Sequence, residues 1–370
     1  MSRKANIFNY VITMGATLGT LFAAVYVCGS VYYQTMMQAA LKFIVGALIA
    51  GLVHTFAHEL GHYLLGKKNG FTFSSMTVWF FKWAKVGAKT KFNLVMIGDE
   101  AGYTEMIPVG KENLSARLKK MTSGGIIASF LFMLIGVPAF FVTINSIWLF
   151  AIWVMFLPIG AYFFFGSVLP ASSYGARNDG AVLYGLKKKD DESIVTLSLL
   201  AFQAEMYVGK SPAEIEEKIL FELPQLPEDS LTFLMLLNAR YMYYVDKEDY
   251  ENAKKVSQRL DSVIEYAPKG YECAIKTDLL YNACTFDYDE DKADDLVYEL
   301  EKYLNNVNTV QTVRAKLAYL IRVKRETENT DVFFKKGYKE ADRCQIKGLG
   351  KYERKLYDGL KASLKENIEE

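Results

Sequence analysis

The histidines of this chain are confined to one short stretch. All three, His54, His58 and His62, lie within nine residues, and His58-Glu59-Leu60-Gly61-His62 forms an H-E-x-x-H pattern. On a helix, positions i and i+4 share one face, so both imidazoles can bind one zinc ion at about 2.0–2.1 Å. The Glu at i+1 then lies where it can deprotonate a water molecule that zinc activates. The pattern predicts a hydrolytic site with one Zn2+ per chain, with His58 and His62 as ligands and Glu59 as general base.

The third histidine does not complete this ligand set. His54 and His62 are eight residues apart, which is about 12 Å along a helix axis and too far for one ion. A pair formed by His54 and His58 would lack a glutamate at the correct spacing. We expect His54 to line a substrate-positioning pocket, to hydrogen-bond a metal ligand, or simply to pack against neighbouring helices.

The elements that carry these residues are apolar enough to cross a membrane. No charged residue occurs from Ala5 to Leu41 or from Met121 to Ala176. A spanning helix needs about 20 apolar residues, so we predict four spans, at about 7–31, 37–66, 121–142 and 147–169. Glu59 then lies within a span, where an ionisable group costs a few kcal/mol. Metal binding explains its presence better than a snorkelling glutamate beside two interfacial histidines.

The two halves of the 370-residue chain face different solvents. Residues 1–186 hold 14 Lys/Arg and 6 Asp/Glu, whereas residues 187–370 hold 29 Lys/Arg and 36 Asp/Glu. This division predicts a transmembrane domain at 1–189 and a cytosolic helical domain at 190–370. It excludes a single soluble domain and a disordered chain, and the lack of a basic tract gives nucleic acid no support as a partner.

Basic residues indicate how the spans are oriented. One topology places every basic cluster in the cytosol, with turns at 30–34 and 143–146 outside; the clusters are Arg3-Lys4, Lys67-Lys68, 117–120 and 187–189. We therefore predict a multi-pass protein of the cell membrane, in contact with the lipid bilayer, with both termini cytosolic. The compact core and short loops favour a bacterial source.

Two further expectations concern whether the first span is retained and the redox state of the cysteines. No small-x-small cleavage site follows the first apolar run, so we expect a retained helix rather than a signal peptide. Cys273, Cys284 and Cys344 match no zinc spacing. In a cytosolic domain they should be reduced thiols in the core.

The second half shows a weak repeat of about 40 residues. Helical segments are expected at 238–268, 281–304 and 313–344, each long enough for a helix pair. This pattern resembles a tetratricopeptide-like array, and an irregular helical bundle fits it nearly as well. Either could bind a protein partner, such as the cytosolic tail of a substrate or a regulator.

An H-E-x-x-H inside a transmembrane helix resembles the site-2 protease family of intramembrane zinc metalloproteases, here over roughly residues 37–186. In that family an Asp-Gly pair on a later membrane segment supplies the third zinc ligand. Asp179-Gly180 follows the fourth predicted span, so the resemblance implies Asp179 as that ligand. The family also opens its middle core helix with a Gly-x-x-x-small element, which Gly125 and Ser129 match. This implies substrate positioning, although the same spacing also permits close helix packing.

The resemblance further implies a small sheet at the membrane surface, and one feature departs from the family. The aromatic-rich insert at about 70–107 reads as β-hairpin strands, with 91–97 and 103–107 flanking a turn at 98–102. The family usually has Asn-x-x-Pro and then Pro shortly before the Asp-Gly pair. This chain has no matching Asn, and a polar stretch from Ala171 to Asn178 separates Leu169-Pro170 from Asp179. Asn178 or Asp179 could instead cap a helix, and Glu105 is a competing metal ligand.

Together these observations predict a mainly α fold: a polytopic membrane helical bundle with a small β-hairpin insert, followed by a cytosolic α-helical domain. The resemblance implies a zinc-dependent metalloendopeptidase that hydrolyses a peptide bond in or near a transmembrane segment of a membrane-bound substrate. A helical substrate must unwind, and an exposed strand edge of the hairpin near residues 70–107 could hold it by β-addition, which proline substitutions along 91–97 would test. The alternative is a non-catalytic metal-binding scaffold that binds transmembrane segments or peptides. The insert is too short to hold a PDZ domain as well, and four spans without a repeat give a transporter little support.

Overall fold

The computed structural model describes residues 3–32, 36–87, 89–95, 102–173, 175–326 and 330–369. The chain divides into two compact units. The first, here called the membrane unit, comprises 1–84, 91–106 and 113–193. The second, the helical unit, comprises 85–90, 107–112 and 194–370. Each unit is described separately.

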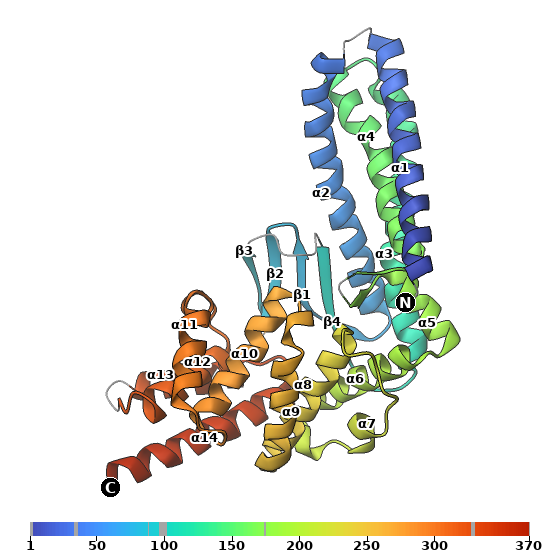
Figure 1. The fold of residues 1–370 in the computed structure, drawn as a ribbon. Coiled ribbons are helices and arrows are strands. Elements are labelled where there is room, and N and C mark those ends of the chain that lie inside the picture. Colours follow the sequence, from blue (N-terminus) through green and yellow to red (C-terminus); the bar gives the residue numbers. More distant parts are fainter. Residues whose placement is uncertain are drawn as a thin grey trace. The chain divides into compact units, whose positions relative to one another are not determined.

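The membrane unit is built on four long apolar helices, as predicted. They are α1 (Arg3–Tyr32), α2 (Met36–Lys68), α3 (Leu114–Thr143) and α4 (Ile147–Val168). Each is long and apolar enough to cross a bilayer. In Figure 1, α2 packs against α3 and α4, and α1 lies along α4. The predicted turn at 143–146 joins α3 to α4. The turn predicted at 30–34 is helical up to Tyr32, where α1 ends, and its remaining residues lie outside the described ones.

Helix α3 starts seven residues before the predicted span. Leu114 to Lys120 are helical although they include Arg117, Lys119 and Lys120. Charged side chains are compatible with a helix that continues beyond the apolar run. The Arg117 side chain holds this end in place, because it donates hydrogen bonds to the carbonyl oxygens of Asn69 (2.8 Å) and Gly70. The first turn of α3 is therefore tied to the segment that follows α2.

Small residues set the distance between α2 and α3. A Cβ on Gly61 would lie 2.2 Å from the Gly124 carbonyl oxygen, and a Cβ on Gly124 would lie 2.2 Å from the Gly61 carbonyl oxygen. No side chain fits at such a distance, so the two backbones touch at this crossing. Because Gly61 lies inside the H-E-x-x-H pattern, the same contact brings the two histidines against α3.

The insert after α2 is a four-stranded sheet. Its strands are β1 (Phe71–Val78), β2 (Phe81–Val86), β3 (Lys89–Leu94) and β4 (Gly102–Pro108), in the spatial order β3-β2-β1-β4. β1 and β2 are antiparallel, with Ser75 opposite Ala84 and Val78 opposite Phe81. The expected hairpin between 91–97 and 103–107 is wrong: β4 neighbours β1, at the edge opposite β3. Most of the turn predicted at 98–102 lies outside the described residues.

A tryptophan at the β1–β2 turn fixes the sheet to α2. Trp79 adopts φ 55°, a left-handed conformation that a bulky residue takes only under constraint. Its indole Nε1–H donates a hydrogen bond to Thr55 Oγ1 at 3.2 Å. The ring lies over Gly51, where a Cβ would be 3.1 Å from Trp79. The sheet is thus anchored one turn before His58.

Beyond α4 the chain forms a short hairpin, β5 (Ser172–Ser173) and β6 (Ala176–Arg177), and then α5 (Asp179–Lys188). Arg177 also holds the start of the helix after α5, because its guanidinium contacts Asp190 at 2.9 Å and Glu192 at 2.6 Å. α6 (Asp191–Val208) follows. This hairpin and α5 position Asp179, as described below.

The helical unit contains successive helices that pack in pairs. After η1 (Pro212–Glu214) and α7 (Lys218–Phe221), the pairs are α8 (Leu231–Asp246) with α9 (Tyr250–Ser262), α10 (Lys269–Cys284) with α11 (Glu290–Asn306), and α12 (Val310–Arg322) with α13 (Thr330–Asp342). η2 (Ile264–Tyr266) links α9 to α10, and α14 (Lys347–Glu369) packs on α13 and α12. The predicted helical segments are confirmed, while their assignment as a tetratricopeptide-like array stays a prediction.

Side-chain caps and one apolar core account for these helices. Asp249, Asp289 and Thr309 cap α9, α11 and α12 by accepting hydrogen bonds from backbone N–H groups of the first turn. The core runs continuously from Val195 to Leu360. In this unit Cys273, Cys284 and Cys344 are free thiols. Burial raises the pKa of the Cys284 thiol to about 12, so this residue behaves as a neutral core side chain.

Candidate metal centre

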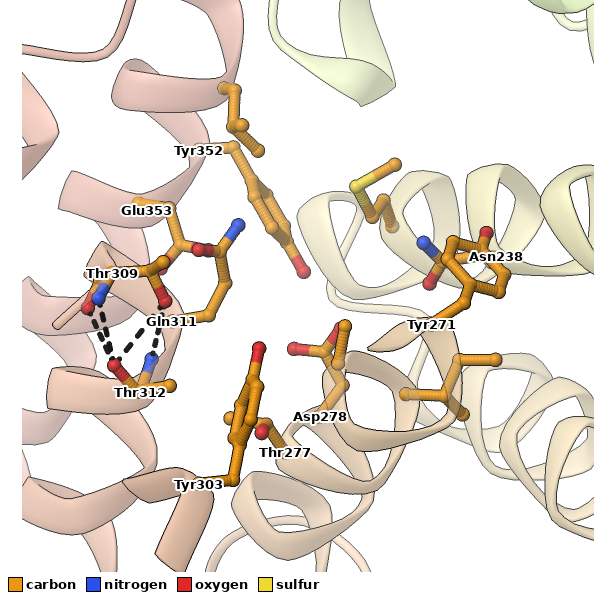
Figure 2. A pocket seen from close by; sticks show the side chains of 14 residues that line it. Asn238, Tyr271, Thr277, Asp278, Tyr303, Thr309, Gln311, Thr312, Tyr352 and Glu353 are labelled. Carbon is orange, nitrogen blue, oxygen red and sulfur yellow. Dashed lines mark hydrogen bonds between the residues drawn. The ribbon is translucent and has the colours of Figure 1, made fainter. Parts of the chain in front are cut away.

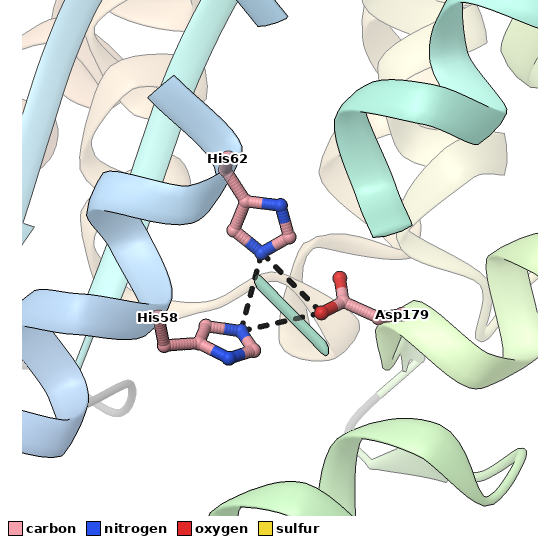
Figure 3. Close-up of side chains that lie close together, drawn as sticks. All are labelled: His58, His62 and Asp179. Carbon is pink, nitrogen blue, oxygen red and sulfur yellow. Dashed lines mark hydrogen bonds and ion pairs between the residues drawn. The ribbon is translucent and has the colours of Figure 1, made fainter. Parts of the chain in front are cut away.

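The two histidines of the H-E-x-x-H pattern meet Asp179 at the C-terminal end of α2. His58 and His62 lie one turn apart on α2, and Asp179 is the first residue of α5. Figure 3 shows the three side chains converging. His58 Nε2 is 3.1 Å from His62 Nε2, and Asp179 Oδ2 is 3.2 Å from the first nitrogen and 3.3 Å from the second. The three residues form a candidate metal-binding group.

These distances fit a tetrahedral ion. Ligand atoms about 2.0–2.1 Å from a tetrahedral zinc ion lie roughly 3.3–3.4 Å from one another. The three separations match the edges of such a tetrahedron to within about 0.3 Å. Three protein ligands leave a fourth position open, which is the arrangement of a catalytic rather than a structural zinc site.

Hydrogen bonds at the other ring nitrogens orient both imidazoles. His62 Nδ1 lies 3.1 Å from the Met121 carbonyl oxygen, which can only accept, so Nδ1 carries the proton and Nε2 presents a lone pair. His58 Nδ1 lies 2.8 Å from the hydroxyl oxygen of Ser129, a fully buried residue. Outer hydrogen bonds of this kind fix the tautomer of metal-binding histidines. Apart from the two imidazole Nε2 nitrogens, the buried Asp179 Oδ2 has no hydrogen-bond donor among the described residues, as suits a metal ligand.

Gly125 lies directly against the histidine rings. A Cβ there would be 2.4 Å from His62 Nε2 and 2.7 Å from His58 Cε1. The sequence suggested helix packing or substrate positioning for Gly125 and Ser129. In the structure, the close helix contact is made by the neighbouring Gly124. Gly125 leaves room for the imidazoles, and Ser129 hydrogen-bonds one of them.

Asn178 and Gly180 hold Asp179 in place. Asn178 caps α5, since its Oδ1 accepts hydrogen bonds from Ala181 N–H and Ala171 N–H, both at 2.9 Å. A Cβ on Gly180 would lie 2.3 Å from the Val168 carbonyl oxygen, so only glycine lets α5 start against the end of α4. The capping alternative and the ligand assignment are therefore compatible, because the cap is Asn178 and the next residue faces the histidines.

Helix α1 braces the same segment. Asn9 Nδ2 donates hydrogen bonds to the carbonyl oxygens of Gly166 (3.2 Å) and Leu169. Asn6 exchanges two hydrogen bonds of 2.9 Å with the backbone of Ser172. The connection between α4 and Asp179 is thus held from the N-terminal helix.

Glu59 lies beside the histidines and is covered by β4. Its side chain is 5% exposed. Thr104 Oγ1 donates a hydrogen bond of 2.6 Å to Glu59 Oε2. A Cβ on Gly102 would lie 2.6 Å from Glu59 Oε1, so glycine keeps the space around that second oxygen open. The edge strand β4 therefore binds one carboxylate oxygen of Glu59 and carries no side chain at the position next to the other.

Two further candidates from the sequence lie apart from the three ligands. His54 is fully buried, hydrogen-bonds the Phe156 carbonyl oxygen at 3.0 Å and packs on the rings of Phe132, Phe156 and Phe163. Of the roles considered for His54, these contacts support packing. Glu105 accepts hydrogen bonds from Ser74 (2.9 Å) and Ser75 (3.1 Å) and does not join the candidate metal group.

Sequence reasoning missed Thr104, Gly102, Asn6 and Asn9. Thr104 is an ordinary strand residue, and its place above Glu59 depends on a strand order that residue patterns do not specify. The two asparagines did offer a signal, because they are polar residues near one end of an otherwise apolar span.

The four apolar helices and a histidine–histidine–aspartate group beside a buried glutamate define a membrane protein with a candidate metallopeptidase site. The sequence profile of peptidase family M50 matches residues 45–332. The chain therefore belongs to peptidase family M50, the site-2 protease family, whose members are generally zinc metalloproteases of membranes. No curated protein and no solved structure shows significant similarity to it.

Proposed function

We propose that this chain is a zinc-dependent intramembrane metalloprotease that cuts a peptide bond in or near a transmembrane segment of a membrane-bound substrate. The observation that carries the proposal is the convergence of His58 Nε2, His62 Nε2 and Asp179 Oδ2 within 3.1–3.3 Å of one another. Family membership supports metalloprotease activity in general. In this proposal the three residues bind one zinc ion.

Zinc bound by these ligands supplies Lewis-acid chemistry, which polarises the scissile carbonyl and lowers the pKa of water toward neutrality. Glu59 takes the proton from the attacking water and later returns it to the leaving amine. Thr104 holds one carboxylate oxygen of Glu59 by its 2.6 Å hydrogen bond, so the other oxygen handles the proton. Ser129 and the Met121 carbonyl keep the imidazoles in the orientation that zinc requires.

The substrate segment must unwind before cleavage, because a helix buries its own carbonyl groups in hydrogen bonds. An edge strand can hold the unwound segment by β-addition. β3, which includes most of the stretch suggested from the sequence, and β4 are the two edges of the sheet. We favour β4, since it carries the hydroxyl that contacts Glu59. Proline substitutions in β3 that abolish cleavage while zinc is retained would contradict this choice.

The proposed orientation puts both termini and the helical unit in the cytosol. It rests on the basic residues at the end of α2, in the first turns of α3 and at the end of α5. Residues 190–370 would then meet the cytosolic tail of a substrate or a regulator. The test is a single cysteine introduced as Tyr298→Cys or Lys361→Cys. Its labelling by a membrane-impermeant reagent in intact cells would contradict this orientation.

Two measurements on one set of proteins test the proposal. Wild type, Glu59→Gln and Asp179→Asn are purified in detergent, their zinc content is measured, and cleavage of a synthetic transmembrane peptide is followed. We expect wild type to hold about one zinc ion and cleave the peptide. Glu59→Gln should retain zinc and lose at least about 100-fold in rate, and Asp179→Asn should lose zinc.

Glu105→Gln is the matched control, because this carboxylate lies on the same strand as Thr104 but hydrogen-bonds serines. It should retain both zinc and activity. Zinc in wild type without cleavage by any variant would favour the metal-binding scaffold. Wild type without zinc would refute the ligand assignment.

A further inference from the structure

The helical unit encloses a cavity that the proposed proteolytic function does not use. Its volume is about 180 Å³, well above the roughly 10–15 Å³ that one water molecule needs. It lies among α8, α10, α12 and α14, with Tyr303 of α11 also on its wall. Ala274 and Thr309 on its lining are exposed, so the cavity reaches solvent at that end. It is called the helical-unit cavity below.

Its wall combines apolar side chains with aromatic rings and with polar groups, several of which can accept hydrogen bonds. The polar side chains on the wall are those of Asn238, Thr277, Asp278, Thr309, Gln311, Thr312, Glu353 and the tyrosines 271, 303 and 352. In Figure 2 the hydroxyl groups of Tyr303 and Tyr352 and the carboxylate of Asp278 point toward the same space. Carboxylates only accept hydrogen bonds, and tyrosine hydroxyls can also accept them. The Asp278 carboxylate and the two tyrosine hydroxyls together therefore suit a ligand group that donates hydrogen bonds.

The two carboxylates share one cation. Arg314 is 1% exposed; its Nε is 2.8 Å from Glu353 Oε2, and one of its terminal nitrogens is 2.7 Å from Asp278 Oδ1. Its guanidinium also lies over the Tyr281 ring, 4.2 Å from the centroid. One positive charge thus faces two negative ones. Burial raises the pKa of both carboxyl groups in spite of the guanidinium.

Within the described residues, two buried polar atoms on the wall have no hydrogen-bond partner. Tyr352 is 2% exposed, and its hydroxyl makes no hydrogen bond within the described part of the chain. The same holds for Asn238 Oδ1, which is buried on the other side of the cavity. Leaving such an atom unsatisfied costs about 1–3 kcal/mol, so both positions favour a ligand that supplies donors.

We propose that the helical-unit cavity binds a cationic nitrogen group, an alkylguanidinium or alkylammonium, from a small molecule or from a basic side chain of a peptide. The group donates hydrogen bonds to Asp278, Tyr352 and Asn238 and supplies the missing positive charge. The tyrosine rings favour the same occupant through cation–π attraction. The site lies wholly within the helical unit and does not depend on the metal centre.

Titration calorimetry on the full-length protein in detergent tests this site with two probes of equal shape. Butylguanidinium should bind with a Kd of about 1 mM, the affinity expected of so small a ligand. The neutral isostere butylurea should bind at least about tenfold more weakly. A capped Ala-Arg-Ala peptide distinguishes the two sources. Tighter binding than butylguanidinium indicates a peptide side chain, and equal or weaker binding indicates a small molecule.

Tyr352→Phe is the decisive variant, because it removes a hydroxyl that has no partner and should not impair folding. It should weaken butylguanidinium binding about tenfold. Asp278→Asn should weaken it further, although it also alters a contact of Arg314. Asp295→Asn and Tyr298→Phe, at exposed positions of α11, are matched controls and should bind as wild type does.

Three results would overturn the proposal. The first is no binding of butylguanidinium at a concentration about ten times the expected Kd. The second is butylurea binding as tightly as butylguanidinium, and the third is an affinity of Tyr352→Phe for butylguanidinium equal to that of wild type.

Discussion

Single atoms decide how Glu59 is held beside the histidines. Of its two carboxylate oxygens, Oε2 accepts the Thr104 hydroxyl hydrogen bond, and Oε1 lies where a Cβ on Gly102 would be 2.6 Å away. A general base needs its carboxylate fixed within hydrogen-bond reach of the proton that it takes. Thr104 is therefore a positioning residue, and its contribution can be separated from zinc binding.

Thr104→Val should slow cleavage while zinc content stays unchanged. The substitution keeps the shape of the side chain but removes a hydrogen bond to a charged group, worth about 1.5–3 kcal/mol, so we expect kcat to fall about 10- to 100-fold with little change in KM. Thr104→Ser keeps the hydroxyl and should restore most of the rate. Steady-state kinetics of the three proteins are the measurement. Equal rates in the valine and serine variants would show that the methyl group matters and the hydrogen bond does not.

Gly125→Ala should weaken zinc binding. The added methyl carbon would lie 2.4 Å from His62 Nε2, so the imidazoles must move away from α3. Disturbing the surroundings of a ligating histidine typically costs 10- to 100-fold in metal affinity, and we expect a loss of about that size. Competition with a zinc chelator measures it. Gly19→Ala in α1, where an added Cβ meets no atom within 4 Å, should bind zinc as wild type does.

At the scale of elements, the Asp179 segment depends on a helix that contributes no ligand. Asn6 and Asn9 of α1 hydrogen-bond the backbone of residues 166–172. The double variant Asn6→Ala/Asn9→Ala should lower zinc affinity about tenfold, because several hydrogen bonds of about 1 kcal/mol each fix the approach to Asp179. Equilibrium dialysis of zinc provides the readout.

The control for that variant lies on the same helix. Within the described part of the chain, Thr20 hydrogen-bonds backbone carbonyl groups of α1 itself, at Ala16 and Thr17. Thr20→Ala should therefore leave zinc affinity unchanged. A loss of zinc in both proteins would mean that α1 as a whole, rather than its asparagines, supports the site.

Much of this arrangement could be predicted from the sequence, because it depends on local signals. The length of each apolar run predicted the four helices, and the i, i+4 spacing placed His58 and His62 on one face. The strand order could not be predicted in this way. Whether β4 pairs with β1 or β3 depends on contacts far apart in the chain, and both pairings satisfy the same residue pattern. The role of Thr104 was missed for that reason.

At the scale of the whole molecule, the two units have separate cores. In the helical unit the core runs from Val195 to Leu360, whereas a distinct apolar cluster in the membrane unit includes Ala24, Phe150 and Val154. Units with separate cores can unfold in separate transitions. A substitution that damages only the helical core should therefore leave the metal centre intact.

Arg314→Met provides this test. The variant leaves Asp278 and Glu353 buried without their shared cation, which should destabilise the helical unit by about 3–5 kcal/mol. In scanning calorimetry we expect one transition to move to lower temperature while zinc content stays at the wild-type level. Arg354→Met removes an ion pair with Asp342 at the surface of the same unit, where such pairs contribute about 0–1 kcal/mol. This variant should change neither the transition temperature nor the zinc content. Loss of zinc in Arg314→Met would show that the metal centre requires a folded helical unit, and the two units would then have to be treated as one cooperative structure.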